Sequence, residues 1–386
     1  MLLIHSLGGG GAERVAVDLS AAWVVRGYRV SLVTQAGRDK DAYTVAEGVE
    51  RHVLGTAGSS RGRLDALWKN WRRVSRVRSL IRKTKPDVVL GMMTTSSVLA
   101  ISAAKGLPCK VIATEHTHPP SQSLSSFWQK ARLRTYPQAH AVIALTAGTA
   151  DWLREHVPGS QVQVIPNAVR WPMDRAEPVV PVPELPEGRK RLLAVGRLHP
   201  VKGFDTLVES FAMLSNYFPD WDLVILGEGE QRAPLEARIA ELELQERIQL
   251  PGRVGNMADW YEQSDLYVLS SRMEGLSNSL LEAMASGVPV AAYPVDGPME
   301  VLGDSRAGAM NEDLRDAWHD ALKVKRHEAR DRALQFNWSK ASARFLSQLV
   351  VLPRHRRQRQ RAGLSVLGHG AQALPKLSHK RHPIVE

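Results

Sequence analysis

The sequence predicts an α/β protein with two Rossmann-like domains that face each other across a cleft. Three observations support this fold class. Short apolar runs alternate with segments of helical periodicity along most of the 386 residues, which is the pattern of β-α-β units. The chain is too long for one ordinary hydrophobic core. A segment with five prolines, residues 171–189, interrupts the alternation and has the composition of an interdomain linker.

These observations divide the chain into five parts. We expect a first domain over residues 1–170, the linker over 171–189 and a second domain over 190–336. A final helix is expected over residues 337–352. Residues 353–386 contain few large apolar side chains and several basic ones, which predicts a disordered basic tail.

The composition is typical of a globular protein, with 44% hydrophobic and 24% charged residues. No apolar run reaches the roughly 18 residues of a transmembrane helix, and the first residues lack the pattern of a signal peptide. The only cysteine, Cys109, excludes an intrachain disulfide and fits a reducing compartment. We therefore predict a cytoplasmic protein.

The net charge of +11 is concentrated in two segments. Residues 61–85 contain ten basic residues and one acidic residue, and residues 351–386 contain eight and one. Apolar residues at helical spacing predict an amphipathic helix over 63–85. Its basic face, together with Trp68 and Trp71, suits binding to the anionic cytoplasmic leaflet of the cell membrane. The alternative is a helix packed on the sheet with a solvated basic face, which the position of both tryptophans on the apolar stripe favours.

The first domain begins with a β-α-β unit. An apolar strand over residues 2–6 precedes the glycines at 8–11, a helix with Val15 and Trp23 on one face, and a strand over 30–34. A glycine-rich turn between a strand and a helix lets backbone amides approach a phosphate closely. It lacks the Gly-Lys-Ser/Thr of a Walker A loop, and a flexible turn without a ligand is the alternative.

Four further strands complete the first domain, with helices between them. The strands are predicted over residues 87–90, 110–114, 141–145 and 162–165, and the helices over 96–105 and from a Thr146 cap to His156. His116 directly follows the strand over 110–114, at the end where open parallel sheets bind ligands. A purely structural histidine is the alternative.

The second domain repeats the alternation. Its first elements are predicted as strands over residues 191–195, 223–226 and 248–250, with helices over 204–214 and up to residue 244. Arg197 and Lys202 flank the turn between the first strand and its helix. Two fixed cations beside a helix N-terminus suit a diphosphate and neutralise it without a metal. Two solvated surface charges are the alternative.

A strand, turn and helix with two glutamates follow. The buried strand is predicted over residues 265–270. Glu274-Gly275 then breaks the pattern, Ser277 or Asn278 caps a helix, and the next strand covers 288–292. Free amides at such a helix N-terminus favour an anionic or polyhydroxyl ligand, and Glu282 could accept hydrogen bonds from a sugar diol. The alternative is a helix with a solvated glutamate at each end.

In combination and order, these motifs resemble one family. The chain resembles retaining glycosyltransferases of the GT-B fold, in the large family often called family 4, over roughly residues 1–350. The two most specific motifs are Gly-Arg-Leu-His-Pro-Val-Lys-Gly-Phe-Asp (196–205) and Glu-Gly-Leu-Ser-Asn-Ser-Leu-Leu-Glu-Ala-Met-Ala-Ser-Gly (274–287). Supporting motifs are Gly-Gly-Gly-Ala-Glu-Arg-Val (9–15), Glu-His-Thr (115–117), Ile-Pro-Asn (165–167) and Leu-Gly-Glu-Gly (226–229). In this fold the final helix, opened by Asn337, tends to lean back on the first domain.

The resemblance implies a role for each motif residue. Glu282 would bind the ribose hydroxyls and Glu274 would face the transferred sugar. Arg197 and Lys202 would stabilise the leaving diphosphate, and His116 would touch the donor sugar across the cleft. The remaining donor-binding residues would be Gly10 and Gly11 from the first domain, Arg253 and Val254 at the base, the amides of Gly275, Leu276 and Ser277 at the sugar, and those of Asn278, Ser279 and Leu280 at the phosphates.

The implied activity is transfer of a hexose from a nucleotide diphosphate sugar with retention of anomeric configuration. UDP-sugars are favoured by the similarity of residues 114–116 and 297–300, and GDP-mannose is the rival donor. Acceptors in this family are saccharides, often lipid-linked, used in surface polysaccharide or glycolipid synthesis. Two Asp-x-Asp triplets, at 39–41 and 220–222, do not lie where a metal-bound donor is expected. We therefore predict that no metal cofactor is needed.

Two other functions remain as alternatives. A nucleotide-sugar epimerase could use the same two-domain scaffold, although the combination of Arg197, Lys202 and the two glutamates favours a transferase. A nucleic-acid-binding protein is suggested only by the charge. No nucleic-acid-binding motif supports it, and an arginine-rich tail binds nucleic acid without sequence preference.

Overall fold

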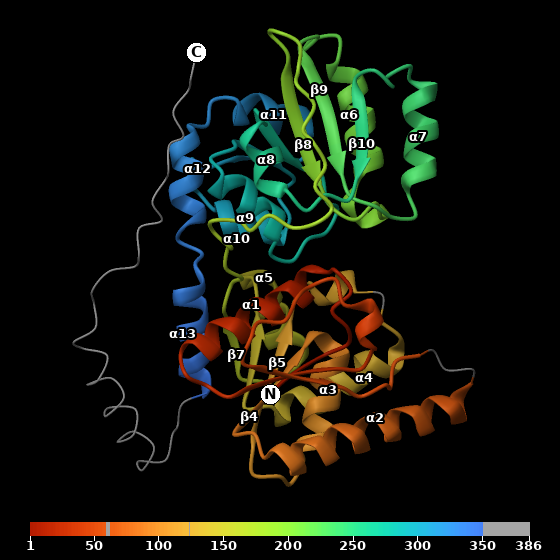
Figure 1. Ribbon diagram of the computed structural model, residues 1–386, viewed down its shortest axis with the longest axis vertical. Coiled ribbons are helices and arrows are strands. Elements are labelled where there is room, and N and C mark those ends of the chain that lie inside the picture. The colour runs from red at the N-terminus through yellow and green to blue at the C-terminus, as the bar shows by residue number, and fades with distance from the viewer. Residues whose placement is uncertain (59–61, 123, 350–386) are drawn as a thin grey trace, which may run out of the picture. The chain divides into compact units, whose positions relative to one another are not determined.

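The computed structural model describes residues 1–58, 62–122 and 124–349. The predicted tail over residues 353–386 lies outside this part. Two β-sheets flanked by helices form the described chain (Figure 1). Neighbouring strands run parallel in both sheets. The predicted α/β class, with two Rossmann-like halves, is confirmed.

The first sheet has seven strands in the order β3-β2-β1-β4-β5-β6-β7. The order reverses between β1 and β4, and such a switch point is where open parallel sheets bind ligands. The strands are β1 (Leu2–Ile4), β2 (Val30–Thr34), β3 (Val49–Val53), β4 (Val88–Met92), β5 (Lys110–Glu115), β6 (Ala141–Ala144) and β7 (Val162–Val164).

Five α-helices accompany this sheet in the described residues. They are α1 (Gly11–Val25), α2 (Arg63–Thr84), α3 (Met93–Ala104), α4 (Ser126–Thr135) and α5 (Ala147–His156). A continuous core joins strand residues such as Leu3, Val89 and Val142 to Ile81 of α2 and Leu153 of α5. The Thr146 side chain caps α5, as predicted, by accepting a hydrogen bond from the Thr149 N–H at 3.2 Å.

The second sheet has six strands in the order β10-β9-β8-β11-β12-β13, with its switch point between β8 and β11. Its strands are β8 (Lys190–Val195), β9 (Trp221–Leu226), β10 (Ile248–Gly252), β11 (Leu266–Leu269), β12 (Val290–Ala292) and β13 (Ala309–Met310). The helices are α6 (Phe204–Leu214), α7 (Arg232–Glu241), α8 (Met257–Glu262), α9 (Asn278–Ala285), α10 (Asp296–Leu302), α11 (Leu314–Ala321), α12 (Arg326–Ala333) and α13 (Trp338–Leu349).

The start of α13 contacts the first half of the chain. Residue Val169 forms a parallel bridge with Asn337, just before α13 begins. Arg26, at the end of α1, donates hydrogen bonds to the Ser339 carbonyl at 3.2 Å and to the Ser342 hydroxyl. Trp23 of α1 meets Phe345 edge to face, with ring centroids 6.3 Å apart. These contacts fix the beginning of α13 against α1.

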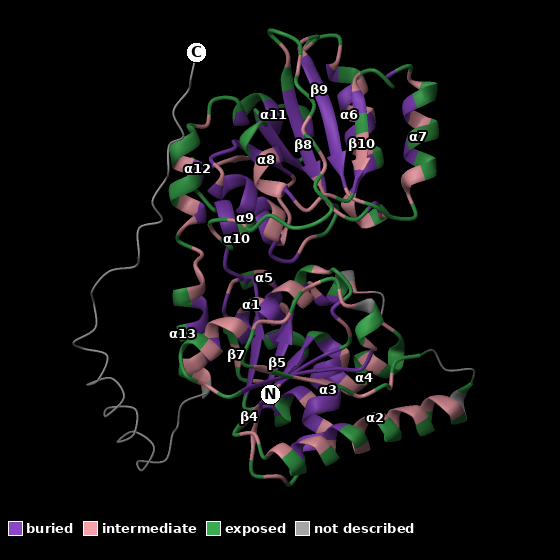
Figure 2. Cartoon of the chain, in the orientation of Figure 1, coloured by how far each residue is buried: buried purple, intermediate pink, exposed green. Residues whose placement is uncertain are grey.

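The helix α2 is buried over only part of its length (Figure 2). Its C-terminal half enters the core through Val77 and Ile81. Its N-terminal half is exposed, with 54% of Trp68 and 67% of Trp71 accessible to solvent. The interpretation of these tryptophans as core residues is therefore wrong, because the apolar stripe of α2 extends past the structure that covers its second half.

Within the described residues, no helix is both long and apolar enough to span a bilayer.

Candidate functional site

Both switch points place predicted site residues at the carboxyl ends of strands. The glycine-rich loop follows β1, Arg197 and Lys202 follow β8, and Glu274 follows β11. The loops touch at specific points. A Cβ added to Gly275 would lie 2.4 Å from the carbonyl oxygen of His116, which follows β5. The two halves of the chain therefore meet at the turn that the sequence assigns to the transferred sugar.

Glu274 and Lys202, an acid and a cation of the predicted set, form a direct ion pair. Lys202 Nζ lies 2.5 Å from Glu274 Oε2, and the Ser271 hydroxyl donates to the same oxygen at 2.9 Å. Gly297 of α10 packs on this turn, because a Cβ there would lie 1.8 Å from the Gly275 carbonyl oxygen. The carboxylate is thus held in place by charge on one side and backbone packing on the other.

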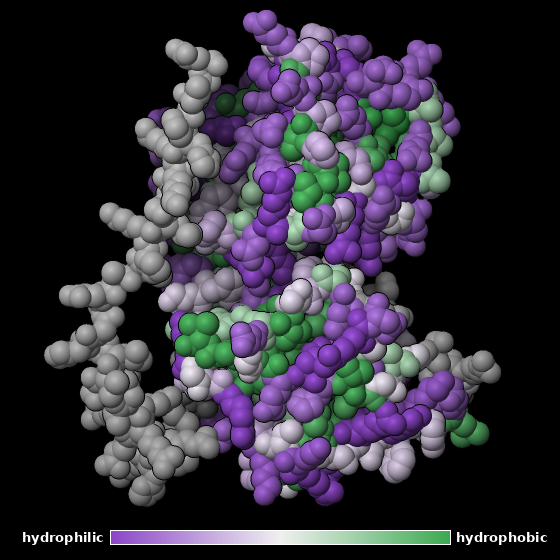
Figure 3. Space-filling model, in the orientation of Figure 1, coloured by the Kyte–Doolittle hydropathy of each residue, from purple (hydrophilic) through white to green (hydrophobic). Residues whose placement is uncertain are grey.

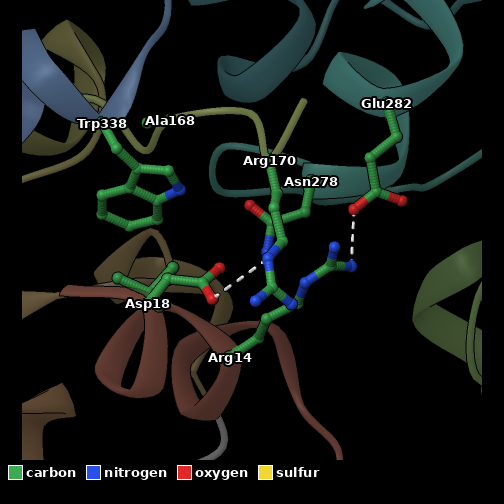
Figure 4. Close-up of a pocket in the computed structure, with 8 residues that line it drawn as sticks. Arg14, Asp18, Ala168, Arg170, Asn278, Glu282 and Trp338 are labelled. Carbon is green, nitrogen blue, oxygen red and sulfur yellow. Dashed lines mark hydrogen bonds and ion pairs between the residues drawn. The ribbon is translucent and has the colours of Figure 1, made fainter. Parts of the chain in front are cut away.

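The second acid, Glu282, is held by one residue from each half of the chain. Arg14 of α1 donates to Glu282 Oε1 at 2.6 Å, and the Tyr261 hydroxyl donates to Oε2 at 3.3 Å. Burial raises the pKa of Glu282, while the charge of Arg14 and the Tyr261 hydrogen bond act in the opposite direction. Figure 4 shows Arg14 reaching toward Glu282 across a small pocket that Asn278 also lines.

The N-terminus of α9 lies between these two acids. Ser277 caps it, as predicted, by accepting from the Leu280 N–H at 3.4 Å, so Leu280 would have to give up this bond to reach a phosphate. The Asn278 side chain accepts from the Asn167 amide at 3.3 Å and donates to the Gly11 carbonyl at 3.5 Å. Leu276 and Ser277 are buried, and Ser279 accepts from the Tyr267 hydroxyl at 2.8 Å.

The other predicted cations lie around the glycine-rich loop. Arg197 is exposed and close enough to Glu13 for its charge to lower the pKa of that carboxyl, which burial raises overall. The Arg253 guanidinium lies 3.7 Å from the position of a Cβ on Gly9, beside Gly10. Val254 is half-buried and packs against the core of the second half. The structure thus brings the predicted residues to the facing loops of the two halves.

Two family profiles match the chain, one to each half. The family described as Glycosyltransferase Family 4 matches residues 9–170, and the family described as Glycosyl transferases group 1 matches residues 178–326. Both profiles describe glycosyltransferases, and together they cover most of the chain. The protein is a glycosyltransferase.

One curated relative of this glycosyltransferase covers almost its whole length. It is the N-acetylgalactosamine-N,N'-diacetylbacillosaminyl-diphospho-undecaprenol 4-alpha-N-acetylgalactosaminyltransferase of Campylobacter jejuni, 25% identical over 91% of this chain and 96% of that protein. Two solved structures share the fold. Sucrose-phosphate synthase from Thermosynechococcus elongatus superposes with a TM-score of 0.75 at 19% identity, over 94% of this chain and 99% of that one. Anabaena HepE with UDP and glucose has a TM-score of 0.71 at 17% identity, over 91% and 99%. The predicted GT-B fold is thereby confirmed.

Sequence reasoning about this glycosyltransferase missed three residues at the site. Arg14 and Tyr261 bind Glu282, and Asn167 binds Asn278. Arg14 lies in the Gly-Gly-Gly-Ala-Glu-Arg-Val motif and Asn167 in Ile-Pro-Asn, so both motifs were found without a role for these side chains. No local signal in the sequence pairs Tyr261 with a residue on the next helix.

A second group of contacts joins the halves beside α5. Asp296 Oδ2 lies 3.1 Å from His118 Nδ1 and accepts from the Thr146 hydroxyl at 3.1 Å. The Ala147 N–H, in the first turn of α5, donates to Glu300 at 2.7 Å. Carboxylates at a helix N-terminus are favoured by its free amides. The acids of α10 therefore stabilise the arrangement of the two halves next to the turn at Gly275.

Three of the four acids in the Asp-x-Asp triplets of the glycosyltransferase form ion pairs. Asp41 binds Arg51 at 3.0 Å, Asp220 binds Lys190 at 3.0 Å, and Asp222 accepts from Arg247 at 3.0 Å. Across residues 1–58, 62–122 and 124–349, no three His, Cys, Asp or Glu side chains form a group that could hold a metal ion.

His116 is half-buried beside the turn at Gly275. Its Nε2 lies 3.0 Å from the Thr114 hydroxyl, and its Nδ1 has no hydrogen-bond partner among the described residues. Burial lowers the pKa of His116 to about 4. The imidazole is thus neutral at physiological pH, and its Nδ1 is shielded from solvent without a partner among the described residues.

We expect His116 to make the folded protein less stable in mild acid. Its pKa is about 4 when folded and about 6.5 when unfolded, so the unfolded chain binds more protons between these values. The contribution to the free energy of unfolding therefore falls as the pH decreases from 6.5, by roughly 2 kcal/mol at pH 5. Urea unfolding of wild type and His116→Asn at pH 7.5 and pH 5 measures this, with the exposed His140→Asn as control. An equal loss in all three proteins would contradict it.

Proposed function

We propose that this glycosyltransferase moves a hexose from a UDP-sugar to a saccharide or lipid-linked acceptor, with retention, in surface polysaccharide or glycolipid synthesis. The main support is the position of Arg197, Lys202, Glu274 and Glu282 around one switch point, facing the glycine-rich loop and His116. The lipid-linked substrate in the name of the Campylobacter relative supports the acceptor class. The UDP and glucose in the HepE complex support the donor class.

In this proposal Glu282 and the start of α9 bind the nucleotide. The Glu282 carboxylate accepts hydrogen bonds from the ribose hydroxyls, and the amides of Asn278 and Ser279 bind phosphate oxygens at the helix N-terminus. Arg197 and Lys202 stabilise the negative charge that develops on the leaving diphosphate. Because this charge grows during bond cleavage, these cations lower the energy of the transition state more than that of the bound donor.

Transfer then proceeds on one face of the sugar. The bond between the anomeric carbon and the phosphate oxygen breaks while the acceptor oxygen forms a bond to the same carbon, and the acceptor proton passes to the leaving phosphate. Retention results without a covalent enzyme intermediate. Glu274 and the neutral His116 hold sugar hydroxyls in position, and the amides of residues 275–277 contribute further donors.

A thermal-shift screen with UDP-, GDP- and ADP-sugars tests the donor class. We expect UDP-hexoses to raise the melting temperature most, while a larger shift with GDP-mannose would favour the rival donor. Nucleotide release should then depend on an added acceptor. Conversion of the donor to an epimer without acceptor would instead support the epimerase alternative.

Transfer should proceed without a metal ion. Arg197, Lys202 and the α9 amides can neutralise the diphosphate by themselves, and Asp41, Asp220 and Asp222 of the Asp-x-Asp triplets are occupied by ion pairs. We expect the rate of transfer to stay within twofold of the untreated enzyme after dialysis against EDTA. Abolished activity that Mg²⁺ or Mn²⁺ restores would contradict a metal-independent mechanism.

We also propose that the exposed half of α2 binds an anionic membrane surface. Leu64, Leu67, Trp68 and Trp71 are all exposed, and Arg72 lies over the Trp68 ring at 5.4 Å. Figure 3 shows hydrophilic and apolar side chains intermixed along this lower edge of the molecule. Aromatic side chains insert into the headgroup region while neighbouring cations attract anionic lipid. Such a surface would bring the enzyme to a lipid-linked acceptor.

Vesicle sedimentation tests this membrane surface. Wild type should sediment with vesicles of phosphatidylglycerol at low salt, and the double variant Trp68→Ser, Trp71→Ser should lose at least 80% of that binding, a rough bound that reflects the loss of most inserted area. Tyr217→Ser removes a still more exposed aromatic from the second half and should bind like wild type. Equal sedimentation of all three proteins would contradict the proposal.

A further inference from the structure

Arg14 joins the two halves of the chain at the predicted ribose site. Its Nη1 lies 2.6 Å from Glu282 Oε1, and the two side chains are 25% and 7% exposed. The Tyr261 hydroxyl binds the other carboxylate oxygen at 3.3 Å. Protein donors therefore bind both oxygens of Glu282, and because this carboxylate side chain is almost fully covered, a ribose diol can reach it only where a neighbouring side chain moves aside.

Of the two residues that bind Glu282, Arg14 is the one whose side chain can move away from it. Tyr261 is fully buried and packed in the core beneath α9, whereas the Arg14 side chain faces a pocket lined by Asn278 and Asp18 (Figure 4). A long side chain at the edge of a pocket can rotate away without moving the backbone. Displacement of Arg14 therefore requires no unfolding of either half.

A displaced Arg14 would need another anion. Leaving a guanidinium in a largely dehydrated interface without a partner is strongly unfavourable. Asp18, one turn further along α1, lies 3.7 Å from Arg170 and so already has a cation beside it. Asp18 also acts on Arg14 through its charge, but a nucleotide diphosphate carries more negative charge than one shared carboxylate and would attract the guanidinium more strongly.

Arg14 lines one small pocket together with Glu282 and with Asn278 at the N-terminus of α9. Glu282 lies about one helical turn, or roughly 5.4 Å, from Asn278 at the N-terminus of α9. The Asn278 side chain donates to Gly11, and the Arg14 N–H donates to the Gly10 carbonyl at 3.1 Å. A rotation of the Arg14 side chain over about one turn of α9 thus brings its guanidinium from Glu282 to the phosphate-binding amides.

We propose that Arg14 is a donor-binding residue that exchanges its partner, from Glu282 to the diphosphate, when the nucleotide binds. The proposal rests on the proposed function, because it takes Glu282 as the ribose ligand. Binding of the ribose and binding of the diphosphate are then coupled through one side chain. Binding of a nucleoside without phosphates would break the Arg14–Glu282 ion pair and would give Arg14 no new anionic partner.

The experiment compares UDP with uridine as ligands of wild type and Arg14→Gln, by calorimetric titration for UDP and ligand-observed NMR for uridine. GDP and guanosine are run in parallel to cover the rival base. We expect Arg14→Gln to weaken UDP binding at least tenfold and to leave uridine binding equal or tighter. Arg14→Lys keeps the charge and should give an intermediate UDP affinity. A thermal melt of each variant verifies that it is folded.

Three outcomes would overturn the exchange. If UDP and uridine both gain affinity by the same factor, Arg14 only competes with ribose and does not bind phosphate. If both ligands lose affinity equally, or neither changes, Arg14 has no selective role at the diphosphate. Glu282→Gln separates this proposal from the proposed function. It should weaken UDP and uridine alike, and unchanged affinity for both would show that the ribose assignment itself fails.

Discussion

Lys202→Met should lower kcat for sugar transfer by about 100- to 1,000-fold, the usual cost of removing one group that stabilises charge in a transition state. Lys202 lies in the turn after β8, and its amine is 2.5 Å from Glu274. In the proposed reaction this cation faces the diphosphate as its charge increases. Because its contribution is largest in the transition state, kcat should fall more than the affinity for donor.

The same substitution removes the partner of a half-buried carboxylate, so stability must be measured beside activity. Lys190→Met is the matched control, since Lys190 lies at the opposite end of β8 and pairs with Asp220 at 3.0 Å. Both variants should melt within a few degrees of wild type, and only Lys202→Met should lose activity. Initial rates at saturating donor and acceptor give kcat. A Lys202→Met enzyme within threefold of wild type would show that Lys202 does not act on the leaving group.

The helices and strands that the sequence predicts correctly are those whose caps, apolar periodicity and ends lie within a short stretch of residues. The α9 helix was found from its Ser277 cap, its apolar face and the glycine that ends it, and these signals lie within eleven residues. The strand β3 and the helix α4 were missed. Residues 49–53 alternate half-buried and exposed positions at the edge of the sheet, and α4 is polar with an exposed Phe127. Neither segment buries enough apolar surface to give a clear period.

The site was predicted as a set of residues but not as a set of contacts. Strand ends and glycine-rich turns indicate which residues face the cleft, because parallel strands bind ligands at their carboxyl ends. The Arg14–Glu282 pair joins residues 268 positions apart, so only the packing of the two halves defines it. The exposure of Trp68 and Trp71 could not be predicted for the same reason. Periodicity identifies an apolar stripe, but it does not show how far the rest of the fold covers that stripe.

Gly275→Ala should lower kcat/KM by about 100-fold while leaving each half folded, since a displacement near 1 Å at a reacting centre costs about that much. A Cβ at this position would lie 2.4 Å from the His116 carbonyl oxygen, far inside van der Waals contact. The clash is with backbone of the opposite half, so a change of side-chain rotamer cannot relieve it. The turn after β11 must instead move away from His116, and Glu274 moves with it.

A glycine with free space provides the control. Gly62 has extended backbone and no atom within 4 Å of an added Cβ, so Gly62→Ala should retain full activity. For Gly275→Ala we expect a melting temperature close to that of wild type together with the loss in kcat/KM, because the clash separates two surfaces and does not open a core. Saturation kinetics with donor and a thermal melt measure both. Wild-type activity in Gly275→Ala would mean that the contact between His116 and the sugar-binding turn is not needed for transfer, and the role of His116 at the donor sugar would then have to be abandoned.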